Sequence, residues 1–250
     1  MRTSADDDKI VAAKNLETLF TDYYTNAERF DHELDSVPFL GQLSSSDGKV
    51  KMLCWNLALQ NGEFKYYCVV RHHPDKRSVV VTAFQDNDSD WRKLLRKPLQ
   101  SKNWYGALYY RILTHKHAGK TYYTLLGWDG NNPITNRKVV DVLTIQGNRI
   151  SLGANLFKMD DRPTYRLVYE YSNDATMTLN YRDKEKMIVM DHLAPEDSRL
   201  EEQYQFYGPD FSYDGLTFKK GKWILKTDIF TKNKGLNNIS KDTKPGSFTD

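Results

Sequence analysis

Apolar and polar residues alternate along much of the chain after residue 50. In the run TYRLVYEY at 164–171, aromatic and aliphatic residues occupy every second position from 165, and Arg166 and Glu170 lie between them. The run MTLNYR at 177–182 alternates in the same way. This period of two, in runs rich in Tyr, Val, Ile and Thr, is typical of antiparallel strands with one face in the core and one in water. We therefore expect Arg166 and Glu170 on a solvent-exposed face.

Roughly a dozen such runs follow, and turn-forming dipeptides such as Asn61-Gly62, Gly147-Asn148 and Gly208-Pro209 separate them. The expected fold class is all-β, an antiparallel meander folded as a sandwich or a barrel. No repeat of about 40 residues is evident, which argues against propeller blades. We expect strands to hold more than about 40% of the residues, well above the usual fraction.

The N-terminal segment follows a different period. From Ile10 to Phe30, apolar residues recur at intervals of three and four, which predicts a helix over 8–30 with one apolar stripe. This stripe must pack on the sheet. A second, shorter helix is predicted near 88–97, where Pro98 stops it.

The chain therefore divides into three parts. Residues 1–36 form an N-terminal helical segment, residues 37–232 form the β domain, and residues 233–250 form a polar tail rich in Gly, Asn, Ser and Lys.

The two cysteines lie on adjacent predicted strands joined by Gln60-Asn61-Gly62. A two-residue Asn-Gly turn puts Cys54 opposite Val69, whereas a three-residue loop with a Gly bulge puts it opposite Cys68. Only the second register permits a cross-strand disulfide. The alternatives are a disulfide, which would indicate an oxidising compartment, and two buried thiols.

Charge and motifs exclude several classes of function. The 36 basic and 33 acidic residues give a formal charge of +3, so we expect no nucleic-acid partner, and the balance favours a neutral ligand such as a glycan or a protein. No run of about 18 apolar residues is present, so no membrane-spanning helix is expected. P-loop, G-x-G-x-x-G, G-x-S-x-G and C-x-x-C motifs are missing, and neither a cofactor nor a metal is predicted. The histidines at 72–73 and at 115 and 117, near predicted hairpin tips, lack a third ligand.

The first candidate site is the segment LGWDGNNP at 126–133. Trp128 suits the stacking of a sugar ring, and Asp129, Asn131 and Asn132 suit hydrogen bonds to its hydroxyls or calcium ligation. The alternative is a structural turn with Trp128 in the core, because Asp-Gly and Asn-Pro are turn dipeptides.

The second candidate site is the segment QYQFYGPDFSYDG at 203–215. Its candidate ligand-binding residues are Tyr207, Asp210, Tyr213 and Asp214. Together with Asp191 and His192 upstream, these carboxylates also allow hydrolysis of a glycoside, if their spacing permits it. The alternative is again a pair of turns. If the two candidate segments form one functional surface, they should meet in the fold.

Four blocks of the sequence resemble a family of uncharacterised exported proteins from Bacteroidetes-type bacteria: SDGKVKMLCWN at 46–56, NWYGALYY at 103–110, TYYTLLGWDGNN at 121–132 and QYQFYGPDFSYD at 203–214. The resemblance spans most of residues 45–230. It implies a periplasmic or surface-associated protein and assigns no catalytic residue. Residues 1–9 contain no apolar core of an export signal, so the alternatives are export after removal of a signal and a cytoplasmic protein with a native Met1.

From these observations we expect an exported binding or envelope-interaction module with a glycan or protein ligand. The alternative is a hydrolase of carbohydrate or peptide that uses carboxylates from 191–214. The sequence does not decide whether the protein is an enzyme.

Overall fold

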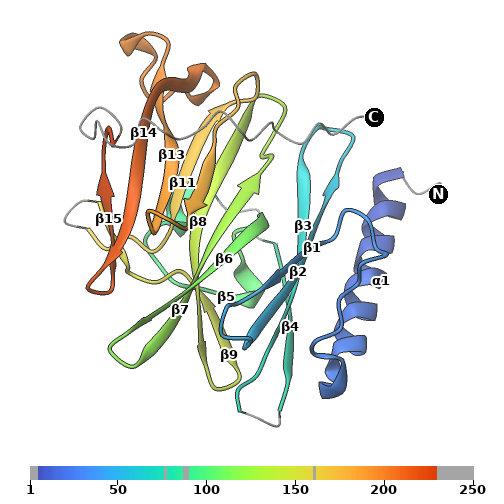
Figure 1. Cartoon of the computed structure of the whole chain (residues 1–250). Coiled ribbons are helices and arrows are strands. Elements are labelled where there is room, and N and C mark those ends of the chain that lie inside the picture. Colours follow the sequence, from blue (N-terminus) through green and yellow to red (C-terminus); the bar gives the residue numbers. More distant parts are fainter. Residues whose placement is uncertain (1–4, 76–77, 87–89, 160–161, 230–250) are drawn as a thin grey trace.

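The chain forms four layers in the computed structural model, which describes residues 5–75, 78–86, 90–159 and 162–229. One long helix covers the outer face of the first of three stacked β-sheets (Figure 1). Strands make up 49% of the structure and helices 17%, and nearly all strand pairs are antiparallel. The predicted all-β fold is confirmed, and of its two alternatives the sandwich is the one observed.

The first sheet is an antiparallel meander in the order β1-β2-β3-β4. Its strands are β1 (Gly41–Ser44), β2 (Val50–Ala58), β3 (Phe64–His72) and β4 (Val80–Phe84). Cys54 pairs directly with Cys68 across β2 and β3, so the loop has the three-residue register. The two Sγ atoms are 3.1 Å apart in the core, and both thiols are free. The expectation that these cysteines face each other is confirmed.

The second sheet lies in the middle, in the order β5-β9-β8-β7-β6, and β11 pairs with the remaining edge of β8. Its strands are β5 (Leu99–Gln100), β6 (Leu108–His117), β7 (Lys120–Asp129), β8 (Thr135–Gln146), β9 (Arg149–Leu152) and β11 (Leu167–Ser172).

The third sheet has the order β10-β15-β14-β13-β12. Its strands are β10 (Phe157–Lys158), β12 (Leu179–Arg182), β13 (Met187–Pro195), β14 (Tyr207–Lys219) and β15 (Lys222–Lys226). The short pair of β10 with β15 is parallel. Along 177–182 the burial alternates as predicted, because this edge has one face on the core and one in water.

The N-terminal helix α1 (Ala5–Thr25) buries Phe20 and Tyr24 against the outer face of the first sheet, where Trp55 lies beside Phe20. It ends earlier than predicted, since Asn26 caps a separate 3₁₀ turn. The second predicted helix is a single turn, α2 (Trp91–Leu94), which begins after the N-cap Asp90. Residues 87–89 and the predicted polar tail at 233–250 lie outside the described residues.

Two cores fill the space between the sheets. Val50, Met52 and Val70 of the first sheet meet Leu125 and Leu143 of the second. On the opposite face of the second sheet, a separate core packs against the third sheet; it includes Val140, Val142, Ile188, Leu216 and Trp223. Within the described part of the chain, no helix is long and apolar enough to cross a membrane.

The predicted exposure of Arg166 and Glu170 is wrong. Arg166 is fully buried and Glu170 is 9% exposed. The reason is that β11 belongs to the middle sheet, so both of its faces are covered. The Arg166 guanidinium is instead satisfied internally, by Asp141 at 3.2 Å and by backbone carbonyls that include that of Leu152 at 3.0 Å. His72 is likewise buried rather than at a tip, with Nε2 3.0 Å from the Gly147 carbonyl.

Candidate functional site

The two predicted segments occupy different environments. Trp128 and Asp129 end β7, and Asn131 and Asn132 form the turn into β8. The second segment, 203–215, contains a 3₁₀ turn and the first half of β14.

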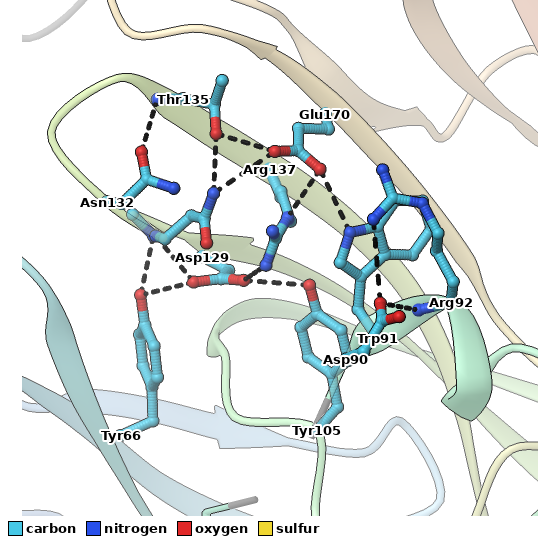
Figure 2. Close-up of polar contacts among 12 residues, drawn as sticks. Tyr66, Asp90, Trp91, Arg92, Tyr105, Asp129, Asn132, Thr135, Arg137 and Glu170 are labelled. Atoms are coloured by element: carbon cyan, nitrogen blue, oxygen red, sulfur yellow. Dashed lines mark hydrogen bonds and ion pairs between the residues drawn. The ribbon is translucent and has the colours of Figure 1, made fainter. Parts of the chain in front are cut away.

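Asp129 is buried and accepts hydrogen bonds on both carboxylate oxygens (Figure 2). The Tyr66 hydroxyl donates to Oδ1 at 3.1 Å, and the Tyr105 hydroxyl donates to Oδ2 at 2.9 Å. Arg137 Nη1 lies 3.3 Å from Oδ2. The backbone N–H of Asn131 completes the set at 2.8 Å. Asp129 therefore ties the first sheet, the β7–β8 turn and β8 together.

Glu170 of β11 occupies the other side of the same arginine (Figure 2). Arg137 Nε donates to Oε2 at 3.1 Å, and the Trp91 indole donates to the same oxygen at 3.1 Å. On Oε1, Thr135 Oγ1 donates at 2.7 Å and Asn131 Nδ2 at 3.3 Å. We call Asp129, Arg137 and Glu170 with these polar neighbours the Arg137 cluster.

The Arg137 cluster is a closed set of donors and acceptors. The side chain of Arg137 is 16% exposed, and those of Asp129 and Glu170 are each 9% exposed. Burial, and then the nearby charge of Asp129, raises the pKa of Tyr66 and of Tyr105 far above its ordinary value, so both hydroxyls stay protonated and donate. Buried carboxylates with this many partners have little capacity left for a ligand.

The rest of the first segment also holds the turn. Asn132 Oδ1 accepts the backbone N–H groups of Ile134 at 2.8 Å and Thr135 at 3.0 Å. Trp128 is half-buried and packs edge-on against Phe64, with ring centroids 5.3 Å apart. Both rings crowd Gly130, where an added Cβ would come within 2.4 Å of Phe64 and 2.7 Å of Trp128. Close packing, not an open aromatic platform, surrounds Trp128.

The second segment opens toward solvent at a β-bulge. Asp191 pairs with Tyr213 and Leu193 with Pro209, so three residues of β14, at 210–212, oppose one residue of β13. The central residue of this bulge is Phe211, which has φ +69° and is 94% exposed. Non-glycine residues rarely adopt this left-handed conformation, and a fully exposed phenylalanine gives it no packing in return.

Beside the bulge lies a pocket of about 430 Å³, which we call the aromatic pocket. The segment 206–210 forms one wall, and the β11–β12 turn and the end of β13 form the others. Its lining includes the aromatic rings of Phe206 and Tyr207 and the carboxylate residues Asp174, Glu196 and Asp210. All three carboxylate residues are exposed, and no Lys or Arg among the described residues lines the pocket.

Two of the four residues predicted in the second segment line the aromatic pocket. They are Tyr207 and Asp210. Asp214 points inward instead: its Oδ2 lies 2.9 Å from His192 Nδ1, and the backbone N–H of Asp228 donates to Oδ1 at 3.2 Å. Tyr213, 36% exposed, follows the bulge and is not part of the pocket lining.

The two predicted segments do not share this pocket, because no residue of 127–132 lines it. A contact between their surroundings exists through Trp91, whose ring centroid lies 6.5 Å from that of Tyr204. Sequence reasoning missed Arg137, Glu170 and Phe211. A charged residue inside the apolar run of 135–143 was the available signal for Arg137, whereas nothing in the sequence marks the bulge at Phe211.

The carboxylates considered for hydrolysis are held by local partners. Asp191 Oδ2 accepts from the backbone N–H of Thr178 at 2.7 Å and from its hydroxyl at 2.9 Å. Asp210 Oδ1 accepts from the N–H and hydroxyl of Ser212 at 3.0 and 2.7 Å. Within the described ranges, no three His, Cys, Asp or Glu side chains gather in a way that could hold a metal ion.

Comparisons of the chain with protein-family models, with curated proteins and with solved structures give no match. The functional argument therefore rests on the geometry of the two regions.

Proposed function

We propose that this protein is a binding module and that its ligand is a glycan held in the aromatic pocket. The observation that supports the proposal is the joint presence of aromatic rings and exposed carboxylates in one concave site. Aromatic faces such as those of Phe206 and Tyr207 suit the apolar face of a sugar ring. The carboxylates of Asp174, Glu196 and Asp210 are acceptors for sugar hydroxyls, and hydrogen bonds to charged groups are the stronger ones.

The size and placement of the pocket support the same proposal. A volume of about 430 Å³ lies within the range of small-ligand sites. The pocket is formed by loops and strand ends at the edge of a rigid sheet, where binding residues are commonly found.

The hydrolase alternative receives less support. A general acid in glycoside hydrolysis needs a raised pKa so that it holds a proton near neutral pH. Burial acts in that direction at Asp210, but the hydrogen bonds from Ser212 outweigh it and lower the pKa of Asp210 below its ordinary value. Asp210 is therefore suited to accept hydrogen bonds rather than to donate a proton.

Calorimetric titration with a panel of neutral oligosaccharides (gluco-, xylo-, manno- and chito-oligosaccharides) tests the proposal. We expect at least one member to bind, and we expect Phe206→Ala and Asp210→Asn each to weaken that binding about tenfold. Phe39→Ala is the matched control, because Phe39 is also exposed (92%) and also has a positive φ, but lies before β1. Absence of binding to the whole panel, or binding that neither pocket variant changes, would contradict the proposal and redirect the search to protein ligands.

We also propose that the protein is exported to the periplasm or cell surface. Support comes from the family resemblance and from the facing pair Cys54 and Cys68, which can form a bond in an oxidising compartment. Protein isolated from its native cells, with free thiols blocked at lysis, should lack the two thiol hydrogens by mass spectrometry. Alkylation of both cysteines in that material would contradict export. Because the closed loop would span about 15 residues, oxidation should stabilise the fold by up to about 3 kcal/mol.

A further inference from the structure

A larger hollow lies at the opposite end of the molecule from the aromatic pocket, between the lower ends of the first and second sheets (Figure 1). We call it the basic groove. Its volume is about 910 Å³. Lys49 and His73 line it from the first sheet, and the β6–β7 and β8–β9 hairpins line it from the second.

The charge of this lining has one sign. Lys49, Lys120 and Arg149 line the groove, all three are exposed, and no Asp or Glu of the described residues lines it. Lys120 and Arg149 form no hydrogen bond or ion pair with any described residue. The nearest carboxylate is that of Asp47, whose charge interacts with Lys49. Two of the three cations therefore have no internal counter-charge.

Asp47 does not occupy the groove, because it is held behind the wall. Its oxygens accept from the Ser45 hydroxyl at 2.7 Å, the backbone N–H of Lys49 at 3.2 Å and the Tyr123 hydroxyl at 3.1 Å. Hydrogen bonds from Ser45 and Lys49 and from Tyr123 outweigh partial burial and lower the pKa of Asp47, so this carboxylate stays charged and bound to its own partners.

Between the cations the lining is rich in neutral hydrogen-bonding groups. These are the side chains of Gln100, Thr121, Thr144, Gln146 and Ser151. The aromatic ring at the base of the groove, that of Tyr123, is 3% exposed, and its hydroxyl is occupied by Asp47. Binding of single-stranded nucleic acid relies on exposed aromatic rings that stack on the bases, and Tyr123 is not available for this. Hydroxyl and amide side chains suit sugar hydroxyls instead.

We propose that the basic groove is a second binding site and that it takes an anionic oligosaccharide, a sugar chain that carries sulfate, phosphate or carboxylate groups. The cations neutralise the anionic groups, and the hydroxyl and amide side chains contact the sugar. This inference does not depend on the aromatic pocket, which has the opposite charge and lies at the other end of the sandwich.

Calorimetric titration with a short dextran sulfate, and with unsulfated dextran of equal length, tests the proposal. The sulfated chain should bind and the unsulfated one should not. Binding should weaken as salt is raised, because exposed charges are screened. The double variant Lys120→Gln/Arg149→Gln should lose about tenfold or more in affinity. The matched control is Arg182→Gln/Lys184→Gln, which removes the same charge from the exposed β12–β13 hairpin and should change affinity less than about twofold.

Equal losses in the two double variants would show general charge attraction and overturn the groove assignment. Tighter binding of a single-stranded DNA of matched charge than of dextran sulfate would overturn the assignment to a sugar chain. Phe206→Ala should leave dextran sulfate binding unchanged, so failure of the groove proposal and failure of the aromatic-pocket proposal are separately visible.

Discussion

The Arg137 cluster and the aromatic pocket look alike in the sequence and differ in the fold. Each comes from a segment with aromatic rings, carboxylates and turn dipeptides. In the cluster the carboxylates of Asp129 and Glu170 are buried on either side of one guanidinium. In the pocket the carboxylates are exposed and no arginine or lysine among the described residues lines the site.

This contrast shows that the presence of a counter-charge separates a structural carboxylate from one that is free to bind. Arg137 comes from β8 and is brought between β7 and β11 by the sheet, so the local sequence of 126–133 does not contain the residue that decides its role. The basic groove extends the lesson. A formal charge of +3 hides an acidic pocket at one end and a basic groove at the other, so net charge alone gave too simple a view of the ligand.

The most destabilising change should be Arg137→Met, which leaves two buried carboxylates without their shared cation. We expect a loss of about 3–5 kcal/mol in the free energy of unfolding, measured by urea denaturation. The control is Arg111→Met, which breaks an exposed ion pair with Asp183 and should cost less than about 1 kcal/mol. Equal losses in the two variants would remove the distinction between the cluster and an ordinary surface pair.

The second prediction compares two aromatic residues. Trp128→Ala should cost about 2 kcal/mol, less than a fully buried tryptophan, because the ring is half-buried against Phe64. Phe211→Ala should cost almost nothing, because Phe211 is 94% exposed. Thermal melts of both variants check this. A Trp128→Ala protein with an unchanged melting temperature and weakened glycan binding would restore Trp128 as a binding residue.

Much of the fold was predictable from local pattern, and the cluster was not. Turn dipeptides and alternation locate most strands, and the loop around Asn61 permits the register that pairs Cys54 with Cys68. The same alternation misplaced Arg166 and Glu170, because it reads one strand at a time and cannot show that a third sheet covers the other face. Likewise, the bulge at Phe211 depends on the pairing of two distant strands.

The third prediction concerns the strained backbone at the pocket. A side chain at left-handed φ costs on the order of 1–2 kcal/mol, so Phe211→Gly should stabilise the protein by about 0.5–1 kcal/mol after the entropy cost of glycine. If the exposed ring of Phe211 adds to the glycan surface, the same variant should weaken binding. Urea denaturation and calorimetry together measure both effects. A destabilised Phe211→Gly protein would contradict the strain at this bulge.

The smallest effect should come from His192. Its hydrogen bond to Asp214 outweighs partial burial and raises the pKa of His192 above its ordinary value. The stabilisation is therefore complete below about pH 6.5, the unfolded value, and is lost as pH rises through the folded pKa. The side chain is 42% exposed, so solvent screening keeps the effect below about 0.5 kcal/mol. The stability gap between the wild type and His192→Gln should be larger at low than at high pH, and a gap that widens as pH rises would contradict the pairing.

The most direct measurement compares Asp129→Asn with Asp210→Asn, two identical changes in the two regions. For each variant, urea denaturation gives the free energy of unfolding and calorimetry gives glycan affinity. We predict that Asp129→Asn costs about 3 kcal/mol, because it removes a buried charge from Arg137, and that it leaves glycan binding of the folded protein unchanged. Asp210→Asn should leave stability within about 0.5 kcal/mol and weaken binding. The reverse pattern, with a stable Asp129→Asn protein that fails to bind and a destabilised Asp210→Asn protein that binds normally, would contradict the assignment of both regions.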